Sequence, residues 1–183
     1  MNALLGIADF LIHVLFTLYV YALMIRMLLA LTHADFYNPF SQSILTITSP
    51  ALRPLHKWVP NIGRLDTSAL LLMIAIKFTE LMLRGIFVGR DVETGVLVFA
   101  AIFGVIDLAL NLYIFAIIAL VAISWLAPHL HRQSNPLVSV LHSITAPILY
   151  PARRMIPQVG VFDFSTSVVL LALFCAKILL HSL

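Results

Sequence analysis

The sequence predicts an all-α membrane protein with four transmembrane helices, arranged as two tandem two-helix repeats with short amphipathic cytoplasmic loop helices. Three observations lead to this fold class. The 183 residues are 62% hydrophobic and only 10% charged, and a soluble domain needs far more charge to cover its surface. The apolar residues form long runs, and one proline-rich segment occurs twice.

Four apolar stretches are long enough to cross the hydrocarbon core, which takes about 20 residues. They lie at about 7–32, at about 68–88, within 96–127 and at about 165–182. All four are expected to be helices, because lipid offers backbone groups no hydrogen-bond partner. The third stretch is longer than one crossing requires. Either it tilts, or residues 96–104 form an interfacial piece before the true span, which is the alternative we favour.

The repeated segment divides the chain into two halves. Residues 38–66, NPFSQSILTITSPALRPLHKWVPNIGRLD, recur 97 positions later as residues 135–163, NPLVSVLHSITAPILYPARRMIPQVGVFD. The first repeat is expected at 1–95, with its loop at 33–67, and the second at 96–183, with its loop at 128–164. Because two helices return the chain to its starting side, the repeats share one orientation, related by an axis along the membrane normal.

Lysine and arginine placement predicts the orientation. The two long loops carry most of these residues, whereas the termini outside the spans have none. By the positive-inside rule, both loops face the cytoplasm and both chain ends lie outside. The sequence contains no basic run with interleaved aromatic residues, so we expect no nucleic-acid partner.

The repeated loop begins with a helix signal. Asn38-Pro39 and Asn135-Pro136 are typical of helix starts, because Asn caps free amides and Pro at the first helical position needs none. Apolar residues follow at helical spacing, so a short amphipathic helix is expected on the membrane or against the bundle. Pro50 and Pro147 are expected to end it, because a residue before proline avoids the helical region.

The rest of the loop is explained by turning and capping. Each copy adds two prolines, a glycine and an aspartate: Pro54, Pro60, Gly63 and Asp66, then Pro151, Pro157, Gly160 and Asp163. The prolines fix a bent path, the glycines permit a turn, and the carboxylates suit the N-termini of the following spans. A structural loop is therefore the main interpretation, and a docking surface is a compatible one.

Basic residues between the prolines supply the docking interpretation. They are Arg53, Lys57, Arg153 and Arg154. Near a membrane surface each contributes about 1 kcal/mol toward anionic lipid headgroups. We expect these residues to contact such headgroups or a membrane-protein partner.

Polar residues inside the spans are functional hypotheses by default. Asp9 and Asp107 are expected near the outer ends of spans one and three, where a helix N-terminus favours a carboxylate; an ion-binding pair is the alternative. Lys77 and Glu80, with Arg84 further along the same helix face, predict an internal Lys77–Glu80 ion pair. The alternative is the lining of a polar path, or a contact with Asp107 or Asn111.

No reactive constellation is visible. Cys175 is the single cysteine, so the chain has no intrachain disulfide or thiolate cluster. No phosphate-binding loop, zinc-protease helix, haem-attachment motif or nucleophile elbow occurs. We therefore expect no enzyme activity, no cofactor and no metal. His13 is expected to hydrogen-bond to a neighbour rather than to bind metal or haem.

The loop pattern resembles the YggT family of bacterial integral membrane proteins, in both halves and over nearly the whole chain. The resemblance rests on Asn-Pro, Thr-x-Pro, two spaced prolines around basic residues, and Gly-x-x-Asp-x-Ser. It implies an inner-membrane protein without an accepted enzymatic reaction, associated with envelope or osmotic stress tolerance. Chloroplast relatives are associated with cytochrome-complex assembly. The second copy has Tyr150 in place of Arg53, so the basic pattern is not fixed.

These observations favour a non-enzymatic inner-membrane factor that supports envelope assembly or osmotic and extracytoplasmic stress adaptation through its loops. An ion-pathway component for osmotic or potassium balance is the alternative. It would require a homo-oligomer, because a small bundle fills its own centre. A cytochrome or haem assembly factor is a third option, implied only by the resemblance.

Overall fold

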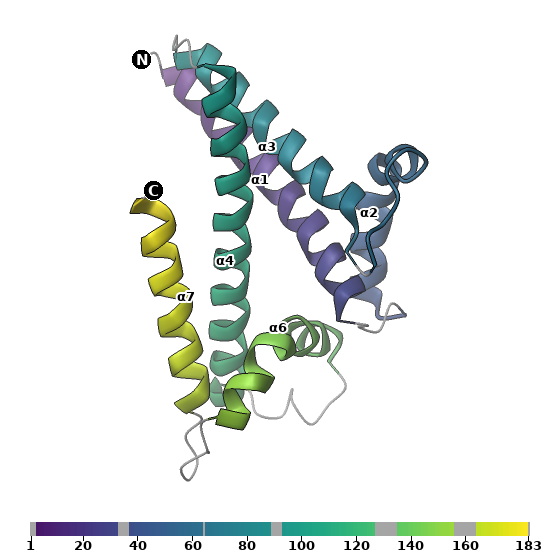
Figure 1. The fold of residues 1–183 in the computed structure, drawn as a ribbon, viewed down its shortest axis with the longest axis vertical. Coiled ribbons are helices and arrows are strands. Elements are labelled where there is room, and N and C mark those ends of the chain that lie inside the picture. Colours follow the sequence, from purple (N-terminus) through teal and green to yellow (C-terminus); the bar gives the residue numbers. More distant parts are fainter. Residues whose placement is uncertain are drawn as a thin grey trace. The chain divides into compact units, whose positions relative to one another are not determined.

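The computed structural model describes residues 3–32, 37–63, 65–88, 93–126, 135–155 and 164–182. All the named elements within these ranges are helices, which confirms the all-α fold class (Figure 1). The helices are α1 (Ala3–Leu31), α2 (Pro39–Leu55), α3 (Thr67–Val88), α4 (Thr94–Leu126), α6 (Pro136–Met155) and α7 (Phe164–Ser182).

The helices form two compact units. One unit comprises Met1–Met27 and Ile44–Leu108, and the other comprises Leu28–Ser43 and Ala109–Leu183. The boundaries fall inside α1, α2 and α4, so they follow internal contacts and do not test the expected repeats at 1–95 and 96–183. The repeat boundaries therefore stay a prediction.

Three of the described helices are long and apolar enough to cross a membrane: α1 from Leu4 onward, α4 and α7. They correspond to the first, third and fourth predicted spans. The second predicted span is α3, which carries Lys77, Glu80 and Arg84 within 22 residues. These three charges lower its apolar character, so composition alone does not identify it as a span.

The separate interfacial piece expected at residues 96–104 is wrong. The chain forms one continuous helix from Thr94 to Leu126. No proline interrupts this stretch, and glycines inside a helix cost only about 1 kcal/mol each. Gly95 and Gly104 are therefore too weak a signal to break it.

The expectation that Pro50 and Pro147 end the loop helices is also wrong. Pro50 and Pro54 lie inside α2, and Pro147 and Pro151 lie inside α6. A proline removes one backbone hydrogen bond and crowds the preceding turn. All four prolines are on the exposed side of their helices. The lost bonds therefore face away from the packed surface, and the helices continue for another turn or more.

The two loop helices use the same local devices. The side chain of Asn38 accepts a hydrogen bond from the Phe40 amide at 2.9 Å, and that of Asn135 accepts one from the Leu137 amide at 3.0 Å. Three equivalent pairs of positions are buried: Ser41 and Val138, Thr48 and Thr145, and Leu52 and Leu149. The expected amphipathic helices are thus present in both loops.

A small apolar core holds α6 in the second unit. Ile117 of α4, Leu149 of α6 and Val169 of α7 are buried together. Leu170 and Leu173 of α7 pack around them. The buried face of the loop helix is therefore an apolar contact with the long helices.

Candidate functional site

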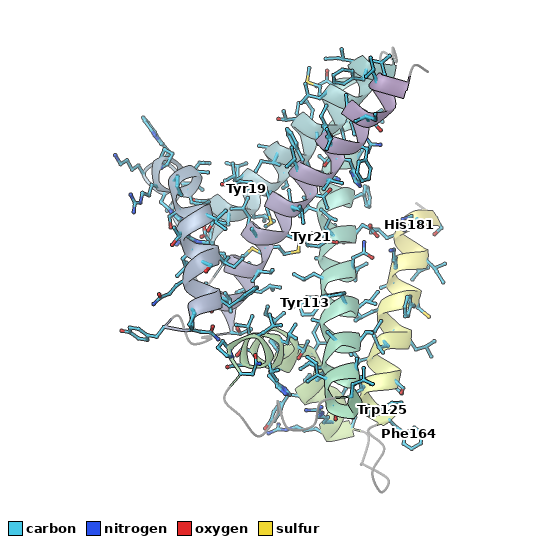
Figure 2. All side chains as sticks on the ribbon, turned by 180° about the vertical axis from the view of Figure 1, so that it is seen from behind. Tyr19, Tyr21, Tyr113, Trp125, Phe164 and His181 are labelled. Atoms are coloured by element: carbon cyan, nitrogen blue, oxygen red, sulfur yellow. The ribbon has the colours of Figure 1, made fainter. Side chains whose placement is uncertain are left out.

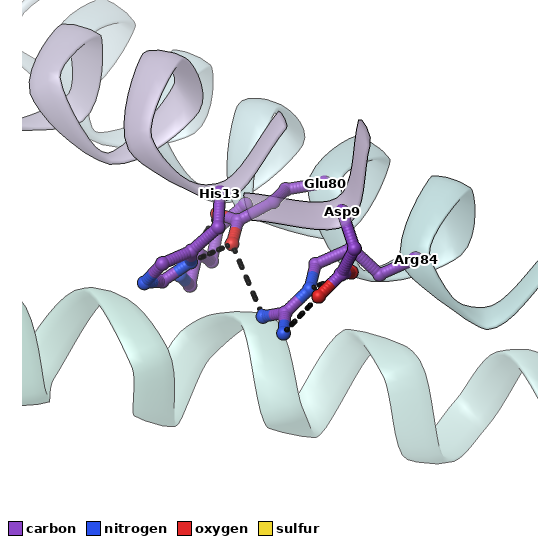
Figure 3. A network of polar contacts seen from close by, with 5 residues as sticks. Asp9, His13, Glu80 and Arg84 are labelled. Atoms are coloured by element: carbon purple, nitrogen blue, oxygen red, sulfur yellow. Dashed lines mark hydrogen bonds and ion pairs between the residues drawn. The ribbon is translucent and has the colours of Figure 1, made fainter. Parts of the chain in front are cut away.

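A polar cluster joins α1 and α3, which lie side by side in the first unit (Figures 1 and 3). We call it the α1–α3 cluster, and it consists of Asp9, His13, Lys77, Glu80 and Arg84. Asp9 and His13 are one helical turn apart on α1, and the other three lie on one face of α3. Figure 3 shows the two sets of side chains reaching toward each other.

Glu80 is the centre of the cluster and is fully buried. One of its oxygens accepts a hydrogen bond from Lys77 Nζ at 2.8 Å, and the other contacts His13 Nδ1 at 2.7 Å. Because a carboxylate only accepts, His13 carries its hydrogen on Nδ1. The Lys77–Glu80 pair expected from their spacing is thus present, and His13 has the protein neighbour expected for it.

The second pair in the cluster is Asp9 with Arg84. Arg84 Nε and Nη2 donate to the two oxygens of Asp9 at 2.7 and 3.2 Å, a forked arrangement. Arg84 Nη1 also lies 3.7 Å from Glu80 Oε1. The two cations, Lys77 and Arg84, therefore balance the two carboxylates, Asp9 and Glu80. Asp9 was expected as a carboxylate at a helix N-terminus or as one of an ion-binding pair with Asp107, so its pairing with Arg84 of α3 is a finding of the structure.

Helix α4 contacts the cluster through a glycine. A Cβ atom on Gly104 would lie 2.9 Å from Lys77 Cε, so a side chain at this position would require the lysine stem to shift. Asp107, one turn further along α4, is half-buried. Asn111 lies in the second unit, where its Oδ1 accepts a hydrogen bond from Lys177 Nζ at 2.6 Å. The spacing of residues in the sequence indicated neither the approach of Gly104 to Lys77 nor the hydrogen bond between Asn111 and Lys177.

The end of the first loop is tied to the start of α3. Asp66 Oδ1 accepts from the Ala69 amide at 3.0 Å, which is the expected N-cap, and Asp66 also contacts His56 Nε2 at 3.0 Å. Gly63 has a positive φ of 61°, the conformation that suits the expected turn. Thr67 Oγ1 donates to the Pro60 carbonyl at 2.7 Å. The equivalent Pro157, Gly160 and Asp163 lie outside the described residues.

The loop helices are also held by side chains from elsewhere. Arg26 of α1 donates to the hydroxyls of Thr48 and Ser49 on α2, at 3.1 and 3.0 Å. Asn38 Nδ2 donates to the Pro136 carbonyl at 2.7 Å, which links the starts of the two loop segments. Asn38 therefore does more than the capping predicted for it.

The four basic residues expected at the membrane surface lie near the ends of α2 and α6, and all are exposed: Arg53, Lys57, Arg153 and Arg154. The guanidinium of Arg154 lies over the Tyr150 ring, 4.5 Å from its centroid. The loop helices thus combine a packed face with an exposed basic end.

Comparison with known proteins gives relatives over both halves of the chain. The CCB3/YggT family model matches residues 5–87 and 99–183. An uncharacterised protein of Pseudomonas aeruginosa is 34% identical over 91% of this chain and 84% of its own length. An uncharacterised protein from Vibrio alginolyticus is 32% identical over 94% of this chain and 92% of its own length. The uncharacterised protein YggT of Escherichia coli is 30% identical over 91% of this chain and 85% of its own length. No solved structure matches the chain.

Proposed function

The chain belongs to the CCB3/YggT family, and we propose that it is a non-enzymatic inner-membrane factor that docks a membrane-protein partner through its cytoplasmic loop helices. Docking would support envelope assembly or adaptation to osmotic and extracytoplasmic stress, the roles that the family resemblance suggests. The relatives compared above are uncharacterised, so the proposal depends on the loops themselves.

One observation carries the proposal: both loops place an amphipathic helix with an equivalent buried face and an exposed basic end. Turning the chain between two spans needs only a few residues. Helices of 17 and 20 residues, α2 and α6, are far longer. Their outward faces are therefore surface beyond what the turn requires, and docking is a use for it.

The proposed topology has four spans in two repeats, with both loops in the cytoplasm and both termini outside. Pairing within the α1–α3 cluster supports α3 as the second span, because charges inside a membrane are accommodated by opposite charges on neighbouring helices. The two separate matches of the family model support the repeat. The basic residues of the loops support the orientation.

The α1–α3 cluster favours a structural role over an ion pathway. A path for ions needs polar groups that can exchange partners with the ion. Here both carboxylates, Glu80 of α3 and Asp9 of α1, are engaged by cations of α3, at 2.7–2.8 Å for the shortest contacts. We therefore assign the cluster to holding α1 and α3 together.

Site-specific photo-crosslinking in native membranes tests the docking proposal. The crosslinker is placed in separate variants at Gln42 and Ser139, exposed positions at equivalent places on α2 and α6. The buried Leu52 is the control position. We expect one membrane protein to be captured from both exposed positions and not from Leu52. Capture of lipid alone, or only of another copy of this chain, would contradict docking to a different protein.

A further inference from the structure

We propose that the C-terminal end of α6 binds the phosphate of an anionic phospholipid through Arg154, held in place by Tyr150. The inference rests on the proposed function, because it requires the second loop helix to lie at the cytoplasmic membrane surface. It assigns that helix end to a lipid headgroup.

The Arg154 guanidinium is preorganised. Its Nη2 donates to the Tyr150 hydroxyl at 2.6 Å, and its Cζ lies over the ring, 4.5 Å from the centroid. A free arginine side chain has many rotamers, and stacking on an aromatic ring removes most of them. The tyrosine hydroxyl uses one N–H group, so the remaining N–H donors of the guanidinium can face a phosphate, which arginine binds in a forked geometry.

The surroundings of Arg154 match a headgroup region. Met155, next in sequence, is 82% exposed. Trp125 near the end of α4 and Phe164 at the start of α7 are 73% and 52% exposed and lie toward the same end of these helices (Figure 2). Exposed aromatic side chains at helix ends mark the membrane interface. Because α6 packs against α7, we place the basic end of α6 at the depth of lipid phosphates.

Charge selects an anionic lipid. Arg153 and Arg154 are adjacent in the last turn of α6, and each basic residue near a membrane surface contributes about 1 kcal/mol toward anionic lipid. A phosphatidylglycerol headgroup offers a net negative charge and a phosphate that can accept two hydrogen bonds. A zwitterionic headgroup offers the same phosphate but places a cation beside the two arginines.

The first loop lacks this arrangement and provides the matched control. Arg53 and Lys57 stand at the positions equivalent to Tyr150 and Arg154. Arg53 lies in the last turn of α2 and Lys57 lies two residues beyond its end, so two like charges follow one another there, whereas Arg154 lies over the Tyr150 ring. Of the two equivalent positions, the first loop has Arg53 and the second has Tyr150, so at this position only the second loop offers an aromatic ring, to Arg154.

Fluorescence quenching by brominated lipids tests the inference on the full-length chain in vesicles. In a Trp58→Phe background, Trp125 is the only tryptophan, because the chain has two. Brominated phosphatidylglycerol, diluted in phosphatidylcholine, should quench Trp125 more than its mole fraction predicts, and brominated phosphatidylcholine should not. Arg154→Gln and Tyr150→Leu should each lower this enrichment several-fold, up to about fivefold for the lost charge. Arg53→Gln with Lys57→Gln should lower the enrichment at Trp125 less than Arg154→Gln alone does, because Tyr150 and Arg154 stay in place.

Equal quenching by the two lipids, or an enrichment that survives both Arg154→Gln and Tyr150→Leu, would overturn the proposal. Loss of the enrichment on adding millimolar inorganic phosphate would also overturn it, because the site would then be one for free phosphate. Circular dichroism confirms that each variant is folded. The quenching assay contains no partner protein, so its failure leaves the docking proposal intact. A failed photo-crosslinking capture from Gln42 and Ser139 likewise leaves the lipid-binding proposal intact.

Discussion

Glu80 is a fully buried carboxylate, which would be strongly destabilising if it were left without partners. Lys77, His13 and Arg84 surround it. The Lys77–Glu80 pair could be predicted, because three residues along a helix bring side chains to one face. The partners on α1 could not, because no spacing rule connects residues that are 67 and 75 positions apart.

Removing one member of the buried pair should be worse than removing both. Glu80→Gln leaves the Lys77 ammonium buried beside a neutral amide, and we expect a loss of about 3 kcal/mol in the free energy of unfolding. The double variant Lys77→Met with Glu80→Gln removes the buried charge and should recover most of that loss. Unfolding of the purified protein in lipid nanodiscs measures both. A double variant at least as unstable as Glu80→Gln would show that the pair matters for more than charge balance.

The two capping asparagines should differ in importance. Both cap their helices, and replacing a cap by alanine costs about 1 kcal/mol. Asn38 also donates to the Pro136 carbonyl, a bond that adds about 1 kcal/mol. Asn38→Ala should therefore destabilise the protein about twice as much as Asn135→Ala in the same unfolding measurement. Equal losses would mean that the link between the loop starts contributes nothing.

Helix α3 shows how an element depends on its neighbour. Alone it is too charged to be recognised as a span, whereas beside α1 its charges are paired.

The helices α4, α2 and α6 are longer than the sequence predicted. Their lengths were underestimated from sequence: α4 is longer than one crossing requires, and the prolines of α2 and α6 were treated as stronger breaks than they are. The prolines are tolerated on the exposed side of α2 and α6, and which side is exposed depends on tertiary packing.

Loss of the α1 partners should impair membrane crossing by α3. In Asp9→Ala with His13→Ala, Arg84 loses its carboxylate and Glu80 loses a donor, so the cost of placing α3 in lipid rises. A cysteine at Glu93, in a Cys175→Ala background, reports the position of the segment after α3. Labelling from outside the cell should fall in the double variant relative to the parent with the same cysteine. Unchanged labelling would mean that α3 crosses without help from α1.

For the whole molecule, composition was sufficient to predict an all-α membrane protein, because a chain that is 62% hydrophobic has too little charge to cover a soluble fold. The repeated loop predicted where its helices begin, and the N-caps of Asn38 and Asn135 are as expected. The division into two compact units was not predictable, because it follows contacts between distant residues rather than the repeat. The four-span topology with cytoplasmic loops is the claim on which docking and lipid binding both depend.

Two-sided cysteine labelling of the full-length chain tests that topology most directly. Single cysteines replace Ser43, Glu93, Ser139 or Ser182 in the Cys175→Ala background, and a membrane-impermeant thiol reagent is applied to intact cells or to inverted vesicles. The account predicts that the loop positions 43 and 139 react only in inverted vesicles and that positions 93 and 182 react only in intact cells. Reaction of 43 and 139 from opposite sides, or of 93 from the same side as 43, would contradict it.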